Sequence, residues 1–462
     1  MISPPDTSHG TTFLLNRLFR LATSGGLAFV LRVGGAAAGV LMNVAVTRAM
    51  GAEEAGRFFV GQIIMITAAM FARLGLDSTI VRQIAAKKVT NDRRGMSDVI
   101  LVSVGFTGMA LCLAGSAVWL AGHELPVFWD PGGYQAVIRS TAWAMIPFAL
   151  TQLLAFGFQG LGRINTYMCF AFLAFPGSVI LLTQLDDRFG IHDAADLMLA
   201  AAIVNALIVV VAGLIWFRFV PPRRYSRSID PRQMIADSVP LLSASGITQG
   251  NRWASQLILA FFASPAVVAA LSNANRAAGL VSFLLTAVDS VVAPRFATLS
   301  SLHRSDAIRR LVYQINGLII AVSAPIVVLV FIFAEPIMGI FGNGFRPHAN
   351  LLRILAIGQF INAATGCVRC AMVMCGHGRE FRNAIGWSAV IGIVVALTLT
   401  PWLGGIGAAI SAAVAASISN VAAAIVMRSV MDINVFNPAN SWNECFHQIL
   451  RLSRGAKMRT DD

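Results

Sequence analysis

Residues 197–217 read LMLAAAIVNALIVVVAGLIWF and contain no charged side chain. An α-helix needs about 20 consecutive, mostly apolar residues to cross the hydrocarbon core of a bilayer. The nearest charges are Asp196 just before the run and Arg218 just after it. The run therefore predicts a transmembrane helix, and it defines the pattern to search for in the rest of the chain.

The same pattern recurs along the whole chain and predicts twelve spans. They cover about 25–46, 57–80, 98–121, 138–158, 165–184, 197–217, 238–262, 266–293, 309–333, 349–375, 382–400 and 404–427. The chain is 56% hydrophobic and only 12% charged, whereas soluble proteins are about 45–50% apolar and about 25% charged. This composition excludes a disordered chain, a collagen-like chain and a disulfide scaffold, and no hydrophilic block is long enough for a soluble domain.

The basic residues set the orientation of these spans. Cytoplasmic segments of membrane proteins carry an excess of Lys and Arg. With the N-terminus in the cytoplasm, most of the 35 basic residues fall in cytoplasmic segments, and acids such as Glu53, Glu54 and Asp193 fall outside. We therefore predict that both termini are cytoplasmic. The net charge of +13 then reflects topology, and no nucleic-acid partner is expected.

The longest basic cytoplasmic segment, 219–237, divides the spans into two sets of six. We expect five segments along the chain. They are an amphipathic segment at 1–24, a six-helix lobe at 25–218, the linker at 219–237, a second lobe at 238–427 and an amphipathic tail at 428–462. An offset of 212 residues aligns Asp77 with Asp289 and Phe71 with Phe283. Six spans per half give parallel repeats, which in transporters place the substrate site between the halves. The fold class is thus an all-α, polytopic membrane protein with 12 transmembrane helices in two six-helix lobes.

Five arginines lie inside the predicted spans and away from their ends: Arg32, Arg73, Arg252, Arg276 and Arg369. An ionisable group in a span normally faces a cavity or a partner, because lipid exposure costs several kcal/mol. Arg252 and Arg276 should lie near the bilayer midplane, where no acidic residue shares their depth. Their neighbours are neutral and polar, and the candidate substrate-binding set is Arg32, Asn43, Gln249, Arg252, Gln256, Asn273, Arg276 and Arg369. Arginine binds phosphate with two-pronged hydrogen bonds and keeps its charge when desolvated, so the set predicts an anionic, hydroxyl-rich substrate.

Two acidic residues lie at the cytoplasmic ends of spans in equivalent positions of the two halves. Arg73 and Asp77 are four residues apart and can form an ion pair on one helix face. Asp289 is the repeat equivalent of Asp77. A structural salt bridge and a gate between the halves, formed by Arg73, Asp77 and Asp289, are both compatible with this pattern.

Motifs for cofactor or metal chemistry are missing from the sequence. There is no GxxxxGK[ST] loop for ATP, and His123-Glu124 lacks the second His of a zinc protease helix. Cys367 and Cys370 have CxxC spacing, but they lie in an apolar helical run, where packing of two small side chains is the favoured interpretation. We therefore expect no cofactor, no metal site and no enzymatic activity.

Several motifs, taken in order, resemble the Wzx-type polysaccharide and oligosaccharide flippases of the multidrug/oligosaccharidyl-lipid/polysaccharide exporter superfamily. They are RAMGAEEAGRF at 48–58, LGLD at 74–77, PRFA at 294–297, EPIMGIFGNGF at 335–345, LLRIL at 351–355 and GHGR at 376–379. The resemblance covers roughly residues 25–430. It implies a V-shaped cavity lined largely by helices 1, 2, 7 and 8, as in MATE transporters, and the arginines other than Arg369 fall on those helices.

The resemblance also implies a function. It is the flipping of an undecaprenyl-diphosphate-linked glycan from the inner to the outer leaflet of the bacterial inner membrane by alternating access. Expected partners are that lipid-linked glycan, membrane lipids and a polysaccharide polymerase or export machinery. Two alternatives stay open: a multidrug or lipid II exporter of the same superfamily, and an O-antigen polymerase or ligase. A drug exporter needs a carboxylate in the cavity to bind cationic substrates, and a polymerase or ligase needs a large outside loop to hold donor and acceptor. The sequence shows neither feature.

Overall fold

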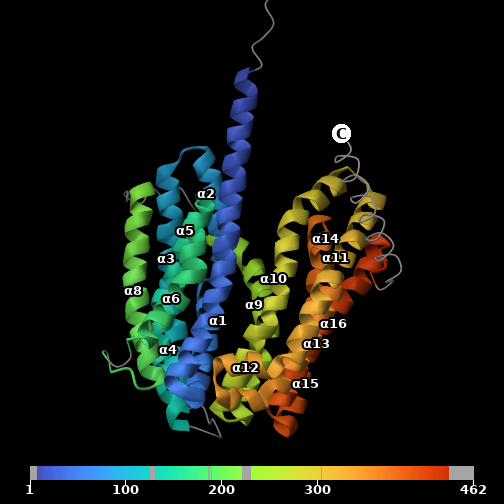
Figure 1. The fold of residues 1–462 in the computed structure, drawn as a ribbon. Coiled ribbons are helices and arrows are strands. Elements are labelled where there is room, and N and C mark those ends of the chain that lie inside the picture. Colours follow the sequence, from blue (N-terminus) through green and yellow to red (C-terminus); the bar gives the residue numbers. More distant parts are fainter. Residues whose placement is uncertain are drawn as a thin grey trace, which may run out of the picture.

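The computed structural model describes residues 8–124, 131–185, 188, 190–220, 230–302 and 304–435, and these contain helices and no strand. Two bundles of helices stand side by side (Figure 1). The first bundle comprises α1 (Ser8–Ala72), α2 (Leu76–Val89), α3 (Arg93–Glu124), α4 (Pro131–Gly160), α5 (Ile164–Met168), the π-helix η1 (Cys169–Leu173), α6 (Ala174–Thr183) and α8 (Ala194–Phe219). The second comprises α9 (Pro231–Phe262), α10 (Pro265–Ser301), α11 (Ser305–Ile332), α12 (Ala334–Phe341), the 3₁₀ helix η2 (Asn343–His348), α13 (Ala349–Ala364), α14 (Val368–Met374), α15 (Gly378–Leu403) and α16 (Gly405–Met431).

Helix α1 contains the first predicted span and most of the second, folded back on each other at Gly51. The backbone there has φ 81° and ψ 179°, a region open essentially only to glycine. Gln62 Nε2 lies 3.6 Å from Met42 Sδ, although 20 residues of straight helix would separate them by about 30 Å. The motif at 48–58 thus forms the turn of a helical hairpin.

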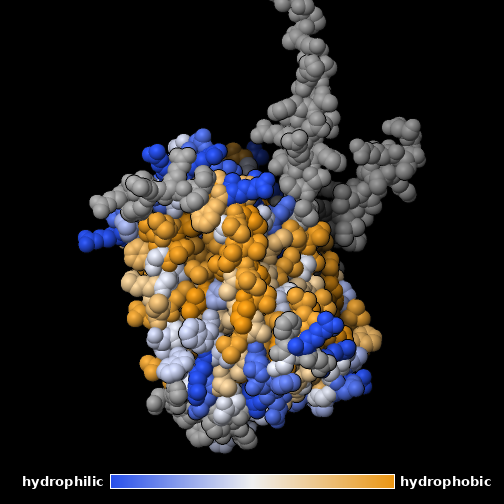
Figure 2. All heavy atoms as spheres, turned by 90° about the vertical axis from the view of Figure 1, so that its left-hand side faces the viewer, coloured by the Kyte–Doolittle hydropathy of each residue, from blue (hydrophilic) through white to orange (hydrophobic). Residues whose placement is uncertain are grey.

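The distribution of apolar and polar residues on the surface fits a protein that lies in a bilayer. Figure 2 shows a broad apolar band across the face of the first bundle that is turned to the viewer, with hydrophilic residues gathered at the two ends. Exposed apolar side chains of the first bundle include Leu207, Leu214 and Trp143, which are 62%, 65% and 62% exposed. A large exposed apolar surface on a folded chain marks contact with lipid or another protein, so this chain is a polytopic membrane protein.

The predicted spans fall largely on helical residues, with breaks at 73–75 and 365–367, and their number stays a prediction. Among the described residues, eight helices are long and apolar enough to cross a membrane, or nine if the bent pair 343–364 and 368–374 is one span. The first predicted span and most of the second lie together in α1, and α9 and α10 are not among the eight.

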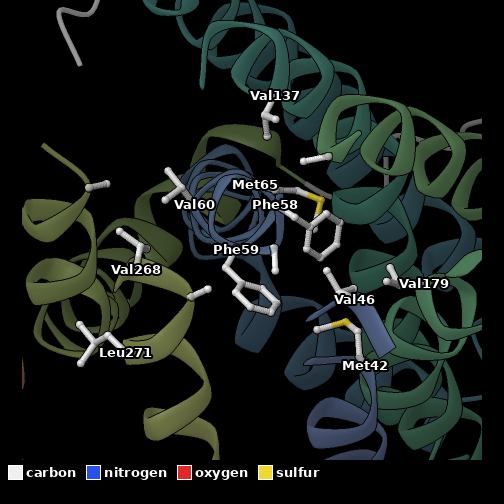
Figure 3. Packing of buried hydrophobic residues seen from close by; sticks show 14 of the residues in the cluster. Met42, Val46, Phe58, Phe59, Val60, Met65, Val137, Val179, Val268 and Leu271 are labelled. Carbon is white, nitrogen blue, oxygen red and sulfur yellow. The ribbon is translucent and has the colours of Figure 1, made fainter. Parts of the chain in front are cut away.

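The two bundles meet along α1 and α10. A Cβ atom built on Gly56 would lie 1.8 Å from the Pro265 carbonyl oxygen, so the two backbones touch and only glycine fits at position 56. Such close approach at small residues is how helices associate in membranes. One continuous hydrophobic cluster spans this contact, and Figure 3 shows Phe59 and Val60 of α1 on the side that faces Val268 and Leu271 of α10.

A second contact between the bundles joins α2 to the start of α9. Thr79 Oγ1 and Ser238 Oγ lie 2.8 Å apart and are buried, and Arg82 Nη2 lies 2.6 Å from Asp237 Oδ2. The predicted topology places this contact at the cytoplasmic end of both helices. The bundles are therefore joined at two separate places.

The expected segment boundaries agree with the helices only in part. Helix α1 begins at Ser8 and runs on from the expected N-terminal segment without a break. Residues 230–237 of the expected linker supply the N-cap and the first two turns of α9, and residues 221–229 lie outside the described residues. The expected amphipathic tail at 428–462 lies outside them beyond residue 435.

Candidate functional site

The contact between α1 and α10 holds two of the predicted site residues directly against each other. Asn43 Nδ2 donates a hydrogen bond to Asn273 Oδ1 at 3.1 Å, and both side chains are fully buried. One turn away on each helix, Arg276 lies against Gly39, and a Cβ built on Gly39 would lie 3.2 Å from Arg276 Nη1. The missing side chain at position 39 thus makes room for the guanidinium group.

Three arginines on α9, α10 and α14 lie within electrostatic range of one another in the order Arg276, Arg252, Arg369. Arg276 experiences the charge of Arg252 on α9, and Arg252 that of Arg369 on α14. No ion pair among the described residues involves Arg252 or Arg276. The two cations therefore repel each other with no carboxylate to compensate, and an anion bound between them would relieve that repulsion.

Neutral polar side chains on α1, α9 and α10 have unsatisfied hydrogen-bond donors and acceptors. Gln256 is 1% exposed, yet neither atom of its amide has a partner. Asn43 Oδ1 and Asn273 Nδ2 are also unsatisfied. A buried polar atom without a partner costs about 1–3 kcal/mol, so this junction of α1, α9 and α10 is suited to a polar ligand. Gln249, one turn before Arg252 on α9, is half-buried.

Arg369 has an acidic partner, contrary to the expectation of an unpaired cation. Its Nη2 lies 2.6 Å from Asp289 Oδ2 on α10, with the side chains 60% and 16% exposed. The sequence pattern missed this pair because the two residues are 80 positions apart and lie on different helices. Since the second oxygen of Asp289 is buried without a partner, this pair is only half satisfied.

Arg73 and Asp77 form the expected ion pair, with Nε and Nη2 at 2.7 Å and 3.2 Å from the two carboxylate oxygens. They do not share one helix face, because α1 ends at Ala72 and α2 begins at Leu76. The pair instead bridges the break between the two helices, and Asp77 lies in the first turn of α2, where a helix favours negative charge.

The repeat-related acids thus pair within their own bundles: Asp77 with Arg73 and Asp289 with Arg369. In this conformation neither pair joins the bundles, and a gating role stays a prediction. Arg32 is exposed, and no ion pair among the described residues involves it. It acts electrostatically on Tyr167 of α5, together with Asp77, so it lies on the first bundle.

The CxxC pair contributes to packing. Cys367 and Cys370 are buried, and the backbone amide of Cys367 donates a hydrogen bond to Asn316 Oδ1 at 3.2 Å. No group of three or more His, Cys, Asp or Glu side chains that could hold a metal occurs in the part of the chain that the structure describes.

Sequence reasoning missed Gly39, Thr79 and Ser238. Gly39 lies in a run of small residues that gives no sign of the arginine packed on it. Thr79 lies two residues after Asp77, within the block that aligns with the second half, but nothing in the sequence indicates its partner Ser238.

Two family models match the sequence of this chain. A family model described as polysaccharide biosynthesis protein matches residues 23–300, and a second, described as MatE, matches residues 244–398. No curated protein matches by sequence.

Solved structures of transporters have the same fold. An inward-facing multidrug resistance MATE family transporter of the MOP superfamily has a TM-score of 0.67 at 14% identity, covering 87% of this chain and 98% of that one. The lipid II flippase MurJ in an inward closed conformation has a TM-score of 0.67 at 14% identity, covering 92% and 91%. An outward-facing MATE family transporter has a lower TM-score of 0.57, at 16% identity over 88% and 95%. These likenesses confirm the MATE-like architecture, and since the first family model matches more than half of the 462 residues, the chain belongs to the polysaccharide biosynthesis protein family.

Proposed function

We propose that this protein moves a polyprenyl-diphosphate-linked oligosaccharide from the inner to the outer leaflet of the bacterial inner membrane by alternating access. The observation that carries the proposal is the pair Arg252 on α9 and Arg276 on α10, which act on each other electrostatically and form no ion pair with a carboxylate of the described residues. Membership of the polysaccharide biosynthesis protein family and the transporter fold support it.

The chemistry of the site favours a diphosphate over a cationic drug. Two neighbouring guanidinium groups bind phosphate oxygens in bidentate fashion, whereas a cation would be repelled. The unsatisfied amides of Asn43, Gln256 and Asn273 are suited to hydroxyl groups of a sugar. The polyprenyl tail would stay in lipid, and only the charged and hydroxylated part would enter between the bundles.

The membrane potential would favour this direction of transport. Moving one elementary charge across 100 mV is worth about 2.3 kcal/mol, and an inside-negative potential drives an anion outward. The same potential draws an empty, cationic site back toward the cytoplasm. Polysaccharide polymerases or export machinery are then the partners that would receive the product.

Lipid II export is the alternative that the same chemistry allows, because lipid II also carries a diphosphate and MurJ has the same fold. Deletion of the gene followed by lipid analysis separates the two. Accumulation of a lipid-linked oligosaccharide other than lipid II in the inner leaflet is the result that we expect.

The first prediction concerns the arginine pair itself. The variant Arg252→Ala, Arg276→Ala should lose glycan export by about tenfold or more per arginine, because a hydrogen bond to a charged group contributes about 1.5–3 kcal/mol. Replacement of both by Lys should restore only part of it, since Lys keeps the charge without the planar fork. The control is Arg379→Ala, Arg428→Ala, two exposed arginines away from the site. Normal export by a well-expressed Arg252→Ala, Arg276→Ala variant would falsify the proposal.

A further inference from the structure

A basic hollow lies at the corner between α10 and α11, away from the site described above. Its volume is about 740 Å³, and Arg295, Arg304 and Arg310 line it together with a single acidic residue, Asp306. Three guanidinium groups against one carboxylate leave an excess of positive charge. Such a concentration of arginines is the usual means of binding a phosphate group.

These three arginines have no acidic partner within the described residues. The ion pairs at this end of the molecule instead include Arg309 Nη2 and Asp432 Oδ2, at 3.4 Å. Helix α11 begins at the same place, and its first turn receives no hydrogen bond from a capping side chain. The partial positive charge of a helix start therefore adds to that of the arginines.

The position of the hollow is at a membrane surface. The bridge from Arg309 to Asp432 joins the start of α11 to the end of α16, and Figure 1 shows this corner at the end of the molecule where α1 begins. By the predicted topology that end faces the cytoplasm. Leu299 and Leu311 also line the hollow, and Leu302 beside it is 57% exposed, so apolar groups accompany the arginines.

An apolar stripe leads from the hollow along α11 toward the membrane interior. Leu318, Val322 and Leu329 follow Leu311 at 7, 11 and 18 positions, which puts all four on one face of a helix with 3.6 residues per turn. Leu318, Val322 and Leu329 are 51%, 38% and 54% exposed. A soluble anion would make no contact with this apolar stripe, whereas the acyl chain of a lipid would pack along it.

We propose that the corner between α10 and α11 binds an anionic phospholipid of the inner leaflet. The phosphate is held by Arg295, Arg304 and Arg310, and an acyl chain lies along Leu318, Val322 and Leu329. Basic pockets on the cytoplasmic side of membrane proteins bind anionic headgroups in this way. The inference goes beyond the transport activity, because neither Arg252 nor Arg276 belongs to the hollow.

Native mass spectrometry of the full-length protein in neutral detergent tests the proposal. The protein is titrated with phosphatidylglycerol, phosphatidylcholine, a polyprenyl diphosphate and inorganic phosphate, and lipid adducts are counted. The test variant is Arg295→Gln, Arg304→Gln, Arg310→Gln. The matched control is Arg232→Gln, Arg379→Gln, Arg382→Gln, which removes the same charge from exposed positions outside the hollow.

We expect at least fivefold fewer phosphatidylglycerol adducts on the test variant than on the wild-type or control protein, and few phosphatidylcholine adducts on any of them. The Arg252→Ala, Arg276→Ala variant should keep its phosphatidylglycerol, which separates this inference from the transport proposal. Equal adducts on test and control variants would overturn it. So would competition by a hundredfold excess of inorganic phosphate, or binding of the polyprenyl diphosphate alone. The thermal midpoint of each variant, measured without lipid, checks that it is folded.

Discussion

At the scale of single residues, the decisive feature is a cation packed against a glycine. Arg276 is placed between α1 and α10 because Gly39 has no side chain, and the buried hydrogen bond between Asn43 and Asn273 holds the two helices together one turn away. The ligand-binding capacity of the site therefore depends on how closely α1 approaches α10, as well as on the arginine itself.

We predict that Gly39→Ala reduces transport about three- to tenfold while leaving the protein folded. The added methyl would lie 3.2 Å from Arg276 Nη1, so the guanidinium must move away from the junction. Gly34→Ala is the matched control on the same helix, because nothing lies within 4 Å of its Cβ position. Alanine in place of a helical glycine should stabilise by roughly 0.5–1 kcal/mol. Equal transport by the two variants, measured as glycan export at matched expression, would contradict the placement of Arg276.

At the scale of elements, the hairpin in α1 depends on one backbone conformation. Gly51 combines φ 81° with ψ 179°, which brings Met42 and Gln62 together. Gly51→Ala should lower the free energy of unfolding by about 1–3 kcal/mol, the usual cost of forcing a side chain into such a region. Thermal unfolding in detergent measures it, with Gly213→Ala on α8 as the control because its Cβ position is open. A Gly51→Ala protein as stable as the control would show that the turn tolerates a side chain.

The start of α3 provides a prediction on pH. Asp92 Oδ1 accepts a hydrogen bond from the Gly95 amide at 2.8 Å, and Lys87 Nζ lies 3.3 Å from Oδ2. The Gly95 amide first, and then Lys87, lower the pKa of Asp92 below its ordinary value of 3.8. A lowered pKa means that the folded state favours the carboxylate. Its contribution to stability is therefore present above the unfolded pKa and is lost as the pH falls through the folded pKa.

We accordingly expect Asp92→Ala to be less stable than the wild-type protein by about 1 kcal/mol at pH 7, which is typical for the loss of a helix N-cap. The difference should shrink below pH 4. Unfolding curves recorded at pH 7 and at successively lower pH measure it. A difference that stays constant down to pH 3 would mean that the charge of Asp92 contributes nothing.

At the scale of the whole molecule, the hydrophobic runs and the loop charges were sufficient to predict helices, two bundles and the pairing of Arg73 with Asp77. They could not predict the ion pair of Arg369 with Asp289 or the contact of Thr79 with Ser238. Residues that meet between two helices have no fixed spacing in a single sequence. The number of spans, twelve, stays a prediction, because eight or nine helices among the described residues are long and apolar enough to cross a membrane. Arg252 and Arg276 were identifiable because an unpaired charge in an apolar run is itself the signal.

The contact between α2 and α9 provides the test of alternating access. Thr79 Oγ1 and Ser238 Oγ lie 2.8 Å apart across the two bundles, and Arg82 and Asp237 form an ion pair one turn away. If the bundles rock against each other during transport, this contact must open in one of the two states.

A disulfide between Thr79→Cys and Ser238→Cys should therefore block transport. The two Oγ atoms are close enough for sulfur atoms in their place to bond with little movement. The pair is introduced after replacement of the exposed Cys112 and Cys169 by serine, and oxidation followed by reduction should switch transport off and on again. Each single cysteine variant, treated in the same way, controls for damage by the oxidant. Undiminished export by a fully cross-linked protein would mean that this contact stays closed throughout the cycle, and that the bundles move about some other axis or not at all.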